Sequence, residues 1–168
     1  MTVKTIIRKV VRNMAENTNC LKSNDTKAVR ELKVVERAFK RAYKVDVEVR
    51  YVDAQYRELY KKKTVNGYYV SKRDVVVVFI NGDTQRNKET LLHELTHAYQ
   101  AQYMTKKFET SVRQKAQGKV SYWDSWHETH ARHCARLLVN SLDFSIDLRV
   151  AESYGLAQDL YADNYYTA

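Results

Sequence analysis

Three residues of the segment LLHELTHAYQ, residues 91–100, carry side chains that can act together on a metal ion. His93 and His97 are four residues apart, so on a helix their rings project from the same face and can bind one cation about 2.0 to 2.1 Å from each nitrogen. Glu94 lies beside that face and can reach a water molecule on the metal without binding the metal itself. A metal lowers the pKa of such a water and polarises a carbonyl group. The segment therefore predicts metal-assisted hydrolysis with Glu94 as the general base.

A catalytic zinc ion takes three protein ligands, so a third ligand must come from elsewhere in the chain. The other three of the five histidines lie in the segment DSWHETHARHCARLL, residues 124–138. Glu128 in this segment has a competing explanation. Ser125-Trp-His-Glu128 matches a capping box, in which the glutamate bonds the backbone at the start of a helix, and His130 is then the expected ligand. The candidates for the third ligand are Asp124, His127, Glu128, His130 and His133.

Hydrolysis also needs a group that stabilises the developing oxyanion. A hydrogen-bond donor or a positive charge aimed at that oxygen serves this purpose. The sequence leaves four candidates open, namely Tyr122, His127, His130 and Arg132.

With these residues in place, the sequence resembles the zincin metallopeptidases, in which His-Glu-x-x-His on an active-site helix supplies two zinc ligands and the catalytic glutamate. In the Glu-zincin branch a glutamate from a later helix is the third ligand, often followed by a small residue three positions on. Glu128-Thr-His-Ala131 is similar to that arrangement, and the resemblance covers roughly residues 75–140. It implies a zinc-dependent peptidase that binds Zn²⁺ through His93, His97 and Glu128, with Glu94 as the general base.

Two other branches of the zincins fit less well. The metzincin motif has glycine and histidine where this chain has Gln100 and Tyr103, which excludes that branch. Small SprT-like proteases, basic zincins that act on DNA-bound proteins, share the size and the order of elements. Their third histidine follows the helix sooner, however, and no histidine lies between His97 and His127. The resemblance to SprT-like proteases is therefore more distant.

The hydrophobic pattern predicts one α+β domain over residues 1–168, a zincin-like domain with a small, mostly antiparallel sheet before the motif helix and helices around it. VDVEVRYV, residues 45–52, alternates like a half-buried strand, and DVVVVFIN, residues 74–81, predicts a central strand covered on both faces. Asn66-Gly67 predicts a hairpin turn. Helices are expected over residues 3–14, from a cap at 23–25 to 43, and over 88–104, 126–140 and 145–161. The segment after residue 104 is expected to be a long connection or an excursion with a short helix.

Basic residues are concentrated in the first half of the chain. Residues 1–73 hold 19 of the 29 Lys and Arg but only 8 of the 20 Asp and Glu, a surplus of 11 positive charges. Such asymmetry attracts nucleic acid or an acidic partner in a salt-sensitive way, or only keeps the surface soluble. The rival of a peptidase is therefore a catalytically silent module that keeps zinc as a structural staple and binds nucleic acid or a protein target with this basic half.

The cysteines and the lack of long apolar segments bear on the compartment. Cys20 and Cys134 are too few for a disulfide framework and fit free thiols in a reducing cytosol. No segment approaches the roughly 18 apolar residues of a membrane span. The N-terminus lacks the apolar core of a secretory signal, although its basic amphipathic pattern also resembles a transit peptide or a membrane-surface helix. We expect a cytoplasmic protein with a protein or peptide substrate and no membrane partner, which by analogy suits a bacterial or phage-encoded enzyme.

Overall fold

The sheet next to the motif helix has three strands in the order β1, β3, β2. The computed structural model describes residues 23–60 and 64–151. β1 (Glu48–Asp53) pairs with β3 (Val75–Ile80) in parallel, whereas β2 (Gly67–Val70) pairs with β3 in antiparallel fashion. The α+β class is confirmed, but the sheet is mixed rather than mostly antiparallel. The reason is that β3 occupies the middle position between two strands that run in opposite directions.

Helix α2 (Thr26–Tyr43) covers the core with one face. It begins after Asp25, whose side chain accepts a hydrogen bond from a backbone N–H of the first turn. Leu32, Val35 and Phe39 are buried, because apolar residues three and four positions apart lie on one side of a helix. The predicted cap and end of this helix are confirmed.

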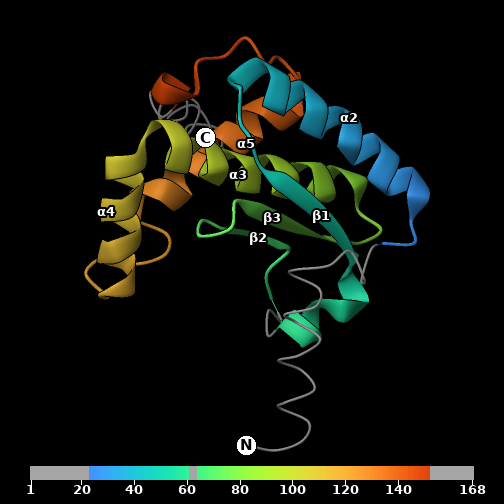
Figure 1. Cartoon of the computed structure of the whole chain (residues 1–168), viewed down its shortest axis with the longest axis horizontal. Coiled ribbons are helices and arrows are strands. Elements are labelled where there is room, and N and C mark those ends of the chain that lie inside the picture. The colour runs from blue at the N-terminus through green and yellow to red at the C-terminus, as the bar shows by residue number, and fades with distance from the viewer. Residues whose placement is uncertain (1–22, 61–63, 152–168) are drawn as a thin grey trace, which may run out of the picture.

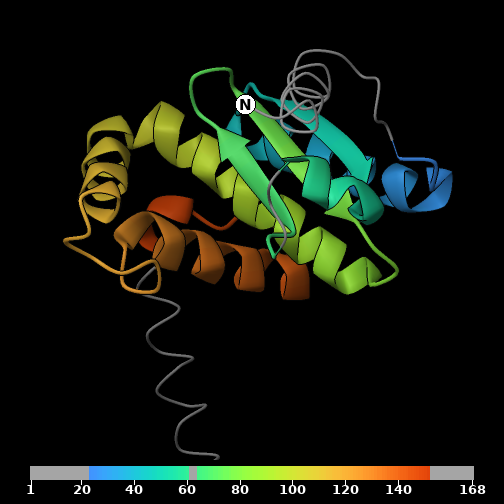
Figure 2. The ribbon, with the colours of Figure 1, turned by 90° about the horizontal axis from the view of Figure 1, so that it is seen from below.

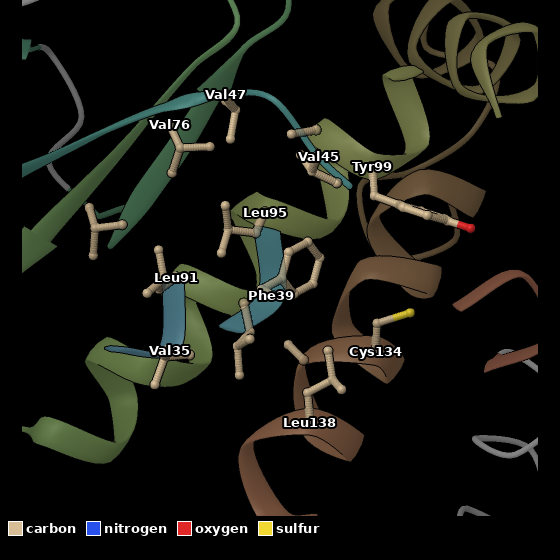
Figure 3. Packing of buried hydrophobic residues seen from close by; sticks show 14 of the residues in the cluster. Val35, Phe39, Val45, Val47, Val76, Leu91, Leu95, Tyr99, Cys134 and Leu138 are labelled. Atoms are coloured by element: carbon tan, nitrogen blue, oxygen red, sulfur yellow. The ribbon is translucent and has the colours of Figure 1, made fainter. Parts of the chain in front are cut away.

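Strand β3 is buried along its whole length, as the apolar run predicts. Its alternate side chains join two different clusters. One cluster packs with α2, α3 and α5, and the smaller cluster packs with a 3-10 helix, η1 (Ala54–Tyr60), on the other face. Figure 3 shows the larger cluster, where Phe39, Leu95 and Leu138 come together from three helices beneath Val76. The sheet is thus held rigidly against the helix that carries the histidines.

Asn66-Gly67 does not form the predicted hairpin turn. Gly67 is the first residue of β2 and pairs with Val78 of β3. The chain reverses instead at residues 71–74, where Asp74 takes a φ of 50°. Glycine is required at 67 for another reason, because a Cβ there would lie 2.8 Å from Thr90 Cγ2 and 2.8 Å from the Val77 carbonyl oxygen. The missing side chain permits β2 to lie close to the motif helix.

Helix α3 (Thr84–Tyr103) carries the motif and lies at the centre of the molecule. It packs against β2 and β3 on one side and against α2 and α5 (Trp126–Ser141) elsewhere. Figures 1 and 2 show α3 and α5 side by side, with α4 (Thr105–Ala116) at one end of the pair. The predicted motif helix, the short helix after it and the helix near residues 126–140 are confirmed. The motif helix begins earlier than predicted because Asp83 caps it.

Some predictions fall outside the described residues, among them the helix over residues 3–14 and most of the one over 145–161. The described part of the latter contains a 3-10 turn, η2 (Leu148–Val150). Cys134 is buried and belongs to no disulfide among the described residues, and Cys20 lies outside the described residues. No helix within residues 23–60 and 64–151 is both long and apolar enough to cross a bilayer.

Candidate metal centre

His93 and His97 project from the same face of α3. Their ring centroids are 4.7 Å apart with the ring planes at 90°, and their Nε2 atoms are 3.2 Å apart. Leu92, just before His93, and Leu95, between the two histidines, are fully buried and fix this part of the helix in the core. The two motif histidines therefore present two nitrogen atoms to one point.

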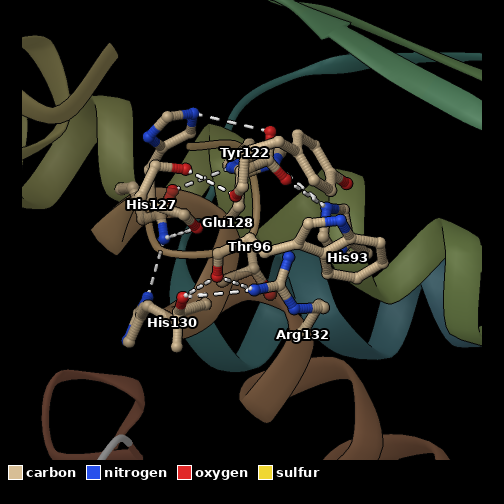
Figure 4. Close-up of polar contacts among 12 residues, drawn as sticks. His93, Thr96, Tyr122, His127, Glu128, His130 and Arg132 are labelled. Carbon is tan, nitrogen blue, oxygen red and sulfur yellow. Dashed lines mark hydrogen bonds and ion pairs between the residues drawn. The ribbon is translucent and has the colours of Figure 1, made fainter. Parts of the chain in front are cut away.

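Glu128 of α5 completes a triangle with the two rings. Its Oε2 atom lies 3.2 Å from Nε2 of His93 and 3.4 Å from Nε2 of His97, and Figure 4 shows its side chain turned towards His93. A tetrahedral ion about 2.0 to 2.1 Å from each donor separates the donors by about 3.3 to 3.4 Å. All three edges of the triangle lie close to that value, so the three residues could hold a metal ion. Among the described residues, these three form the group able to hold a metal ion.

Hydrogen bonds alone do not account for the triangle. Nδ1 of His97 lies 2.9 Å from Oε1 of Gln100, an atom that can only accept. In the neutral ring Nδ1 therefore carries the proton and Nε2 keeps a lone pair. Nε2 of His93, Nε2 of His97 and Oε2 of Glu128 make three contacts with one another. When both rings are neutral, at most one proton, on Nε2 of His93, is available for these contacts. A cation bonded to both nitrogens and to Oε2 of Glu128 satisfies all three contacts at once.

The charges of the centre shift the pKa values of its members. Burial alone would raise the pKa of Glu128, but its close contacts with the rings of His127, His93 and His97 outweigh this effect and hold the pKa far below its usual range. Burial lowers the pKa of His97, but the contacts with the carboxylates of Glu128 and Glu94 outweigh this effect and raise it. Glu128 is therefore an anion at neutral pH, as a zinc ligand must be.

Glu128 does not cap α5. The backbone N–H of Ser125 donates to the Ser121 carbonyl at 2.9 Å, and the Ser125 hydroxyl donates to the Tyr122 carbonyl at 2.9 Å, so the alternative capping box is wrong. The glutamate is held instead by Lys115 of α4, whose Nζ donates to Oε1 at 2.9 Å. This contact leaves Oε2 for the histidines, and the carboxylate is oriented from both sides.

The other predicted ligands lie outside the triangle. Nε2 of His127 is 3.5 Å from Oε1 of Glu128, so this ring stands beside the centre rather than in it. Both ring nitrogens of the fully buried His130 are hydrogen-bonded within the protein. Asp124 is exposed and accepts a hydrogen bond from a neighbouring serine. His133 belongs to no group able to hold a metal within the described part of the chain.

Glu94 occupies the space between the histidines and β2. It is only 7% exposed, and its Cγ atom lies 3.2 Å from the position that a Cβ at Gly67 would take. Burial raises the pKa of its carboxyl, an effect that nearby His93 and His97 partly oppose. A carboxylate with a raised pKa takes up a proton more readily, which suits a general base.

Two adjoining cavities, of about 450 and 320 Å³, open over the centre. Both are lined by residues of β2, of its approach and of the centre: Val65, Gly67, His93, Glu94 and Tyr122. The larger cavity extends past the polar side chains of Arg86 and Glu89. The smaller one extends past Tyr69, Phe108 and Val112. Together they form a cleft that is polar on one side of the centre and apolar on the other.

Tyr122 is the best placed of the four candidate oxyanion donors. It lines both cavities and stands beside Glu128 in Figure 4. Burial, the charge of Glu128 and a hydrogen bond to that carboxylate raise the pKa of its hydroxyl to about 12, so the group stays protonated at neutral pH. His127 lines only the smaller cavity, and His130 lines neither. Arg132 lines the larger cavity, but its guanidinium donates to the Trp123 carbonyl at 2.6 Å.

Three residues that hold the centre were not found from the sequence. Gln100 is three positions after His97 and so lies on the same face of the helix, a spacing that identifies it as a neighbour. Lys115 reaches Glu128 only because α4 packs beside α5, which no spacing reveals. Gly67 carried a signal that was interpreted as a turn.

Comparisons of the chain with known protein families, with curated proteins and with solved structures found no match. A function for this chain must therefore be argued from the geometry of the centre and its cleft.

Proposed function

We propose that this chain is a zinc-dependent metallopeptidase, with Glu94 as the general base. The observation that carries the proposal is the triangle of His93, His97 and Glu128, whose edges of 3.2, 3.2 and 3.4 Å fit a tetrahedral zinc site. The triangle also opens into a cleft, because His93 lines both cavities. A bound zinc ion would supply Lewis-acid activation of a water molecule and of the scissile carbonyl.

The remaining chemistry belongs to the side chains of the cleft. Glu94 stands next to both histidines, takes a proton from the attacking water and delivers it to the departing amine nitrogen. Tyr122 donates a hydrogen bond to the oxygen that becomes negative as the carbonyl is attacked. Lys115 occupies Oε1 of Glu128, which keeps that carboxylate from turning into the cleft.

Strand β2 favours a peptide as the substrate. In the described part of the chain it pairs with β3 on one side only, so no strand lies against its other edge there. An extended peptide can add to such an edge as a further strand. The cleft follows β2 from Gly67 to Tyr69 and passes over Glu94 and the histidines. A peptide paired with β2 would thus lie across the centre, with an apolar side chain placed near Phe108 and Val112.

Glu94→Gln tests this proposal. The amide keeps the size of the side chain but cannot take up a proton, so hydrolysis of unfolded casein is expected to fall by about 10²- to 10⁴-fold while zinc stays bound. Glu109→Gln is the control, because Glu109 is an exposed carboxylate of α4 that lines neither cavity. It should hydrolyse casein like the wild type. Unchanged activity of Glu94→Gln, or wild-type activity that survives a chelator, refutes the proposal.

The outer face of α2 favours a second candidate function, the binding of nucleic acid. Six exposed cations follow one another along this face at spacings of three or four residues, and within the described residues none of them forms an ion pair. The two acidic residues of the helix flank this face rather than interrupt it. In Figure 1, α2 runs along the upper edge of the molecule, away from β2, so a polyanion bound there leaves the cleft open. The six cations are Lys27, Arg30, Lys33, Arg37, Arg41 and Lys44.

Titration of a labelled DNA duplex at about 50 and 200 mM salt tests this second function. The triple change Arg30→Gln, Arg37→Gln and Arg41→Gln is expected to weaken binding and to reduce the salt slope by about 0.9 for each phosphate that the variant no longer neutralises. Arg149→Gln is the control, because Arg149 is an exposed arginine already paired with Asp147. Wild-type affinity in the triple variant rules out α2 as the binding surface.

A further inference from the structure

A fully buried amide links the metal centre to the end of the described chain. Gln100 has no exposed surface, and both ends of its side-chain amide are hydrogen-bonded. Oε1 lies 2.9 Å from Nδ1 of His97. Nε2 lies 2.9 Å from the backbone carbonyl of His127 and 2.8 Å from Nδ1 of His130. The ring of His130 extends this hydrogen-bond network, because its Nε2 lies 2.6 Å from the carbonyl oxygen of Leu148 in η2.

The backbone carbonyl of His127 fixes the direction of these bonds. A carbonyl oxygen can only accept, so the NH₂ group of Gln100 must face it. Oε1 of the same amide must then face His97, and since it too can only accept, Nδ1 of His97 must donate. The proton of the neutral His97 ring therefore lies on Nδ1. Nε2 is unprotonated, and its lone pair faces Glu128.

The hydrogen bonds at the His130 end of this network independently require the same orientation of the Gln100 amide. The second proton of the Gln100 NH₂ group points at Nδ1 of His130, which must accept it. The proton of a neutral His130 ring then lies on Nε2, where the Leu148 carbonyl accepts it. Two backbone carbonyls thus impose the same polarity from both ends, and His97 and His130 are fixed in opposite tautomers.

We propose that Gln100 and His130 are positioning residues of the metal centre. They hold the ring of His97 so that its unprotonated Nε2 faces Nε2 of His93 and Oε2 of Glu128. Neither residue lines the cleft, so neither touches a substrate. Hydrogen-bonded partners of this kind fix the tautomer and the orientation of a metal-binding histidine. The inference rests on the metal site that the proposed function requires, but not on hydrolysis.

A second glutamine of the same helix provides a natural contrast. Gln102 also bridges two elements with both ends of its amide, since Nε2 donates to the Asp46 carbonyl at 2.6 Å and Oε1 accepts from the Asp46 N–H at 3.3 Å. These bonds tie α3 to the segment before β1 and touch no histidine. Gln102→Leu therefore removes a comparable structural bridge and leaves the metal centre intact, which makes it the matched control for Gln100→Leu.

The tautomers can be read directly in the full-length wild-type protein. Long-range ¹H–¹⁵N spectra of the zinc-free chain, recorded at an alkaline pH at which both rings are neutral, should show His97 protonated on Nδ1 and His130 protonated on Nε2. A proton on Nε2 of His97, or on Nδ1 of His130, overturns the proposal. The readout needs neither zinc nor a substrate.

Zinc affinity measured by competition with a chromophoric chelator tests the consequence. Gln100→Leu should bind zinc about 10- to 100-fold more weakly than the wild type, and Gln102→Leu should bind it like the wild type. Gln100→Glu keeps an acceptor opposite His97, so its affinity should recover towards the wild-type value. Equal affinities of Gln100→Leu and the wild type, or a Gln100→Glu affinity no better than that of Gln100→Leu, overturn the proposal.

His130→Phe covers the case in which Gln100→Leu does not fold. The phenyl ring preserves the stacking of residue 130 on Trp126, whose ring centroid is 5.1 Å away, but it offers Gln100 no acceptor. Weaker zinc binding is expected here too, by a smaller factor than for Gln100→Leu, and wild-type affinity contradicts the role of His130. Wild-type protein without any zinc would overturn this inference and the proposed function together, whereas zinc binding without hydrolysis would overturn the function alone.

Discussion

The histidines of α3 and those of α5 differ in how many of their ring nitrogens are hydrogen-bonded to other parts of the protein. His97 has one ring nitrogen engaged by Gln100, and its other nitrogen meets His93 and Glu128 at one point. His130 is just as buried, but both of its nitrogens are engaged by protein groups. His127 bonds the Ser111 hydroxyl through Nδ1, and its Nε2 stands 3.5 Å from Glu128.

The comparison of His97 with His130 shows that a buried histidine is not necessarily able to bind a metal ion. A metal ligand needs a lone pair that no protein donor claims, aimed at a point which other lone pairs share. On α3 the hydrogen bonds create that condition, and on α5 the same kind of bond removes it. The first prediction below tests this difference directly. Two further predictions, with smaller expected effects, carry the comparison to tyrosine hydroxyls and to glycines.

Exchanging single histidines should have the largest effect. His97→Asn removes a donor of the triangle, so the purified variant is expected to lose its stoichiometric zinc and with it all casein hydrolysis. His127→Asn changes a ring beside the triangle and is expected to retain one zinc per chain. Metal content measured by inductively coupled plasma mass spectrometry distinguishes the two. The contrast between the helices breaks down if both variants, or neither, keep the metal.

The tyrosines extend the comparison to hydroxyl groups. Tyr122 lines the cleft on both sides of the centre, whereas the hydroxyl of Tyr103 donates to the Lys44 carbonyl at 2.7 Å, away from the cleft. Tyr122→Phe should lower kcat by about 10²- to 10³-fold with little change in KM, because the missing hydrogen bond is one that forms as the oxyanion develops. Tyr103→Phe should leave kcat unchanged. A normal kcat for Tyr122→Phe would transfer the donor role to His127.

The glycines give the smallest expected effect. A methyl group at position 67 would meet Thr90, the Val77 carbonyl and the Cγ atom of Glu94, whereas a methyl group at Gly82 meets nothing within 4 Å. Gly67→Ala should reduce the free energy of unfolding by about 1 to 3 kcal/mol, and Gly82→Ala should change it by about 0.5 kcal/mol or less. Urea unfolding measures both. Equal stability of the two variants would mean that β2 does not lie tightly against α3.

The elements that position the site could be predicted because their signals are local. The apolar run of β3 and the periodic apolar residues of α2 each report which side of the element is buried. The same holds for the helix that bears His93 and His97. Glycine is ambiguous at this level, since it serves both in turns and where two backbones approach closely. At Gly67 the deciding neighbours, Thr90 and Val77, come from other elements.

The position of Glu128 beside His93 and His97 could be predicted from the sequence only in part. The segment after residue 123 was expected to supply it, and the choice of Glu128 over His130 came from a resemblance rather than from spacing. The difference between the two depends on contacts across the fold. Lys115 from α4 turns Glu128 towards the histidines, and Leu148 engages the ring of His130. No local pattern in the sequence encodes these long-range contacts.

The central claim is that His93, His97 and Glu128 share one zinc ion. Native mass spectrometry of the purified wild-type chain, before and after treatment with a chelator and again after zinc is restored, tests this claim most directly. We expect one zinc per chain that is removed by the chelator and recovered on reloading, with two nitrogen ligands in its X-ray absorption spectrum. A chain that takes up no stoichiometric zinc, or binds it without histidine nitrogen, would contradict the account.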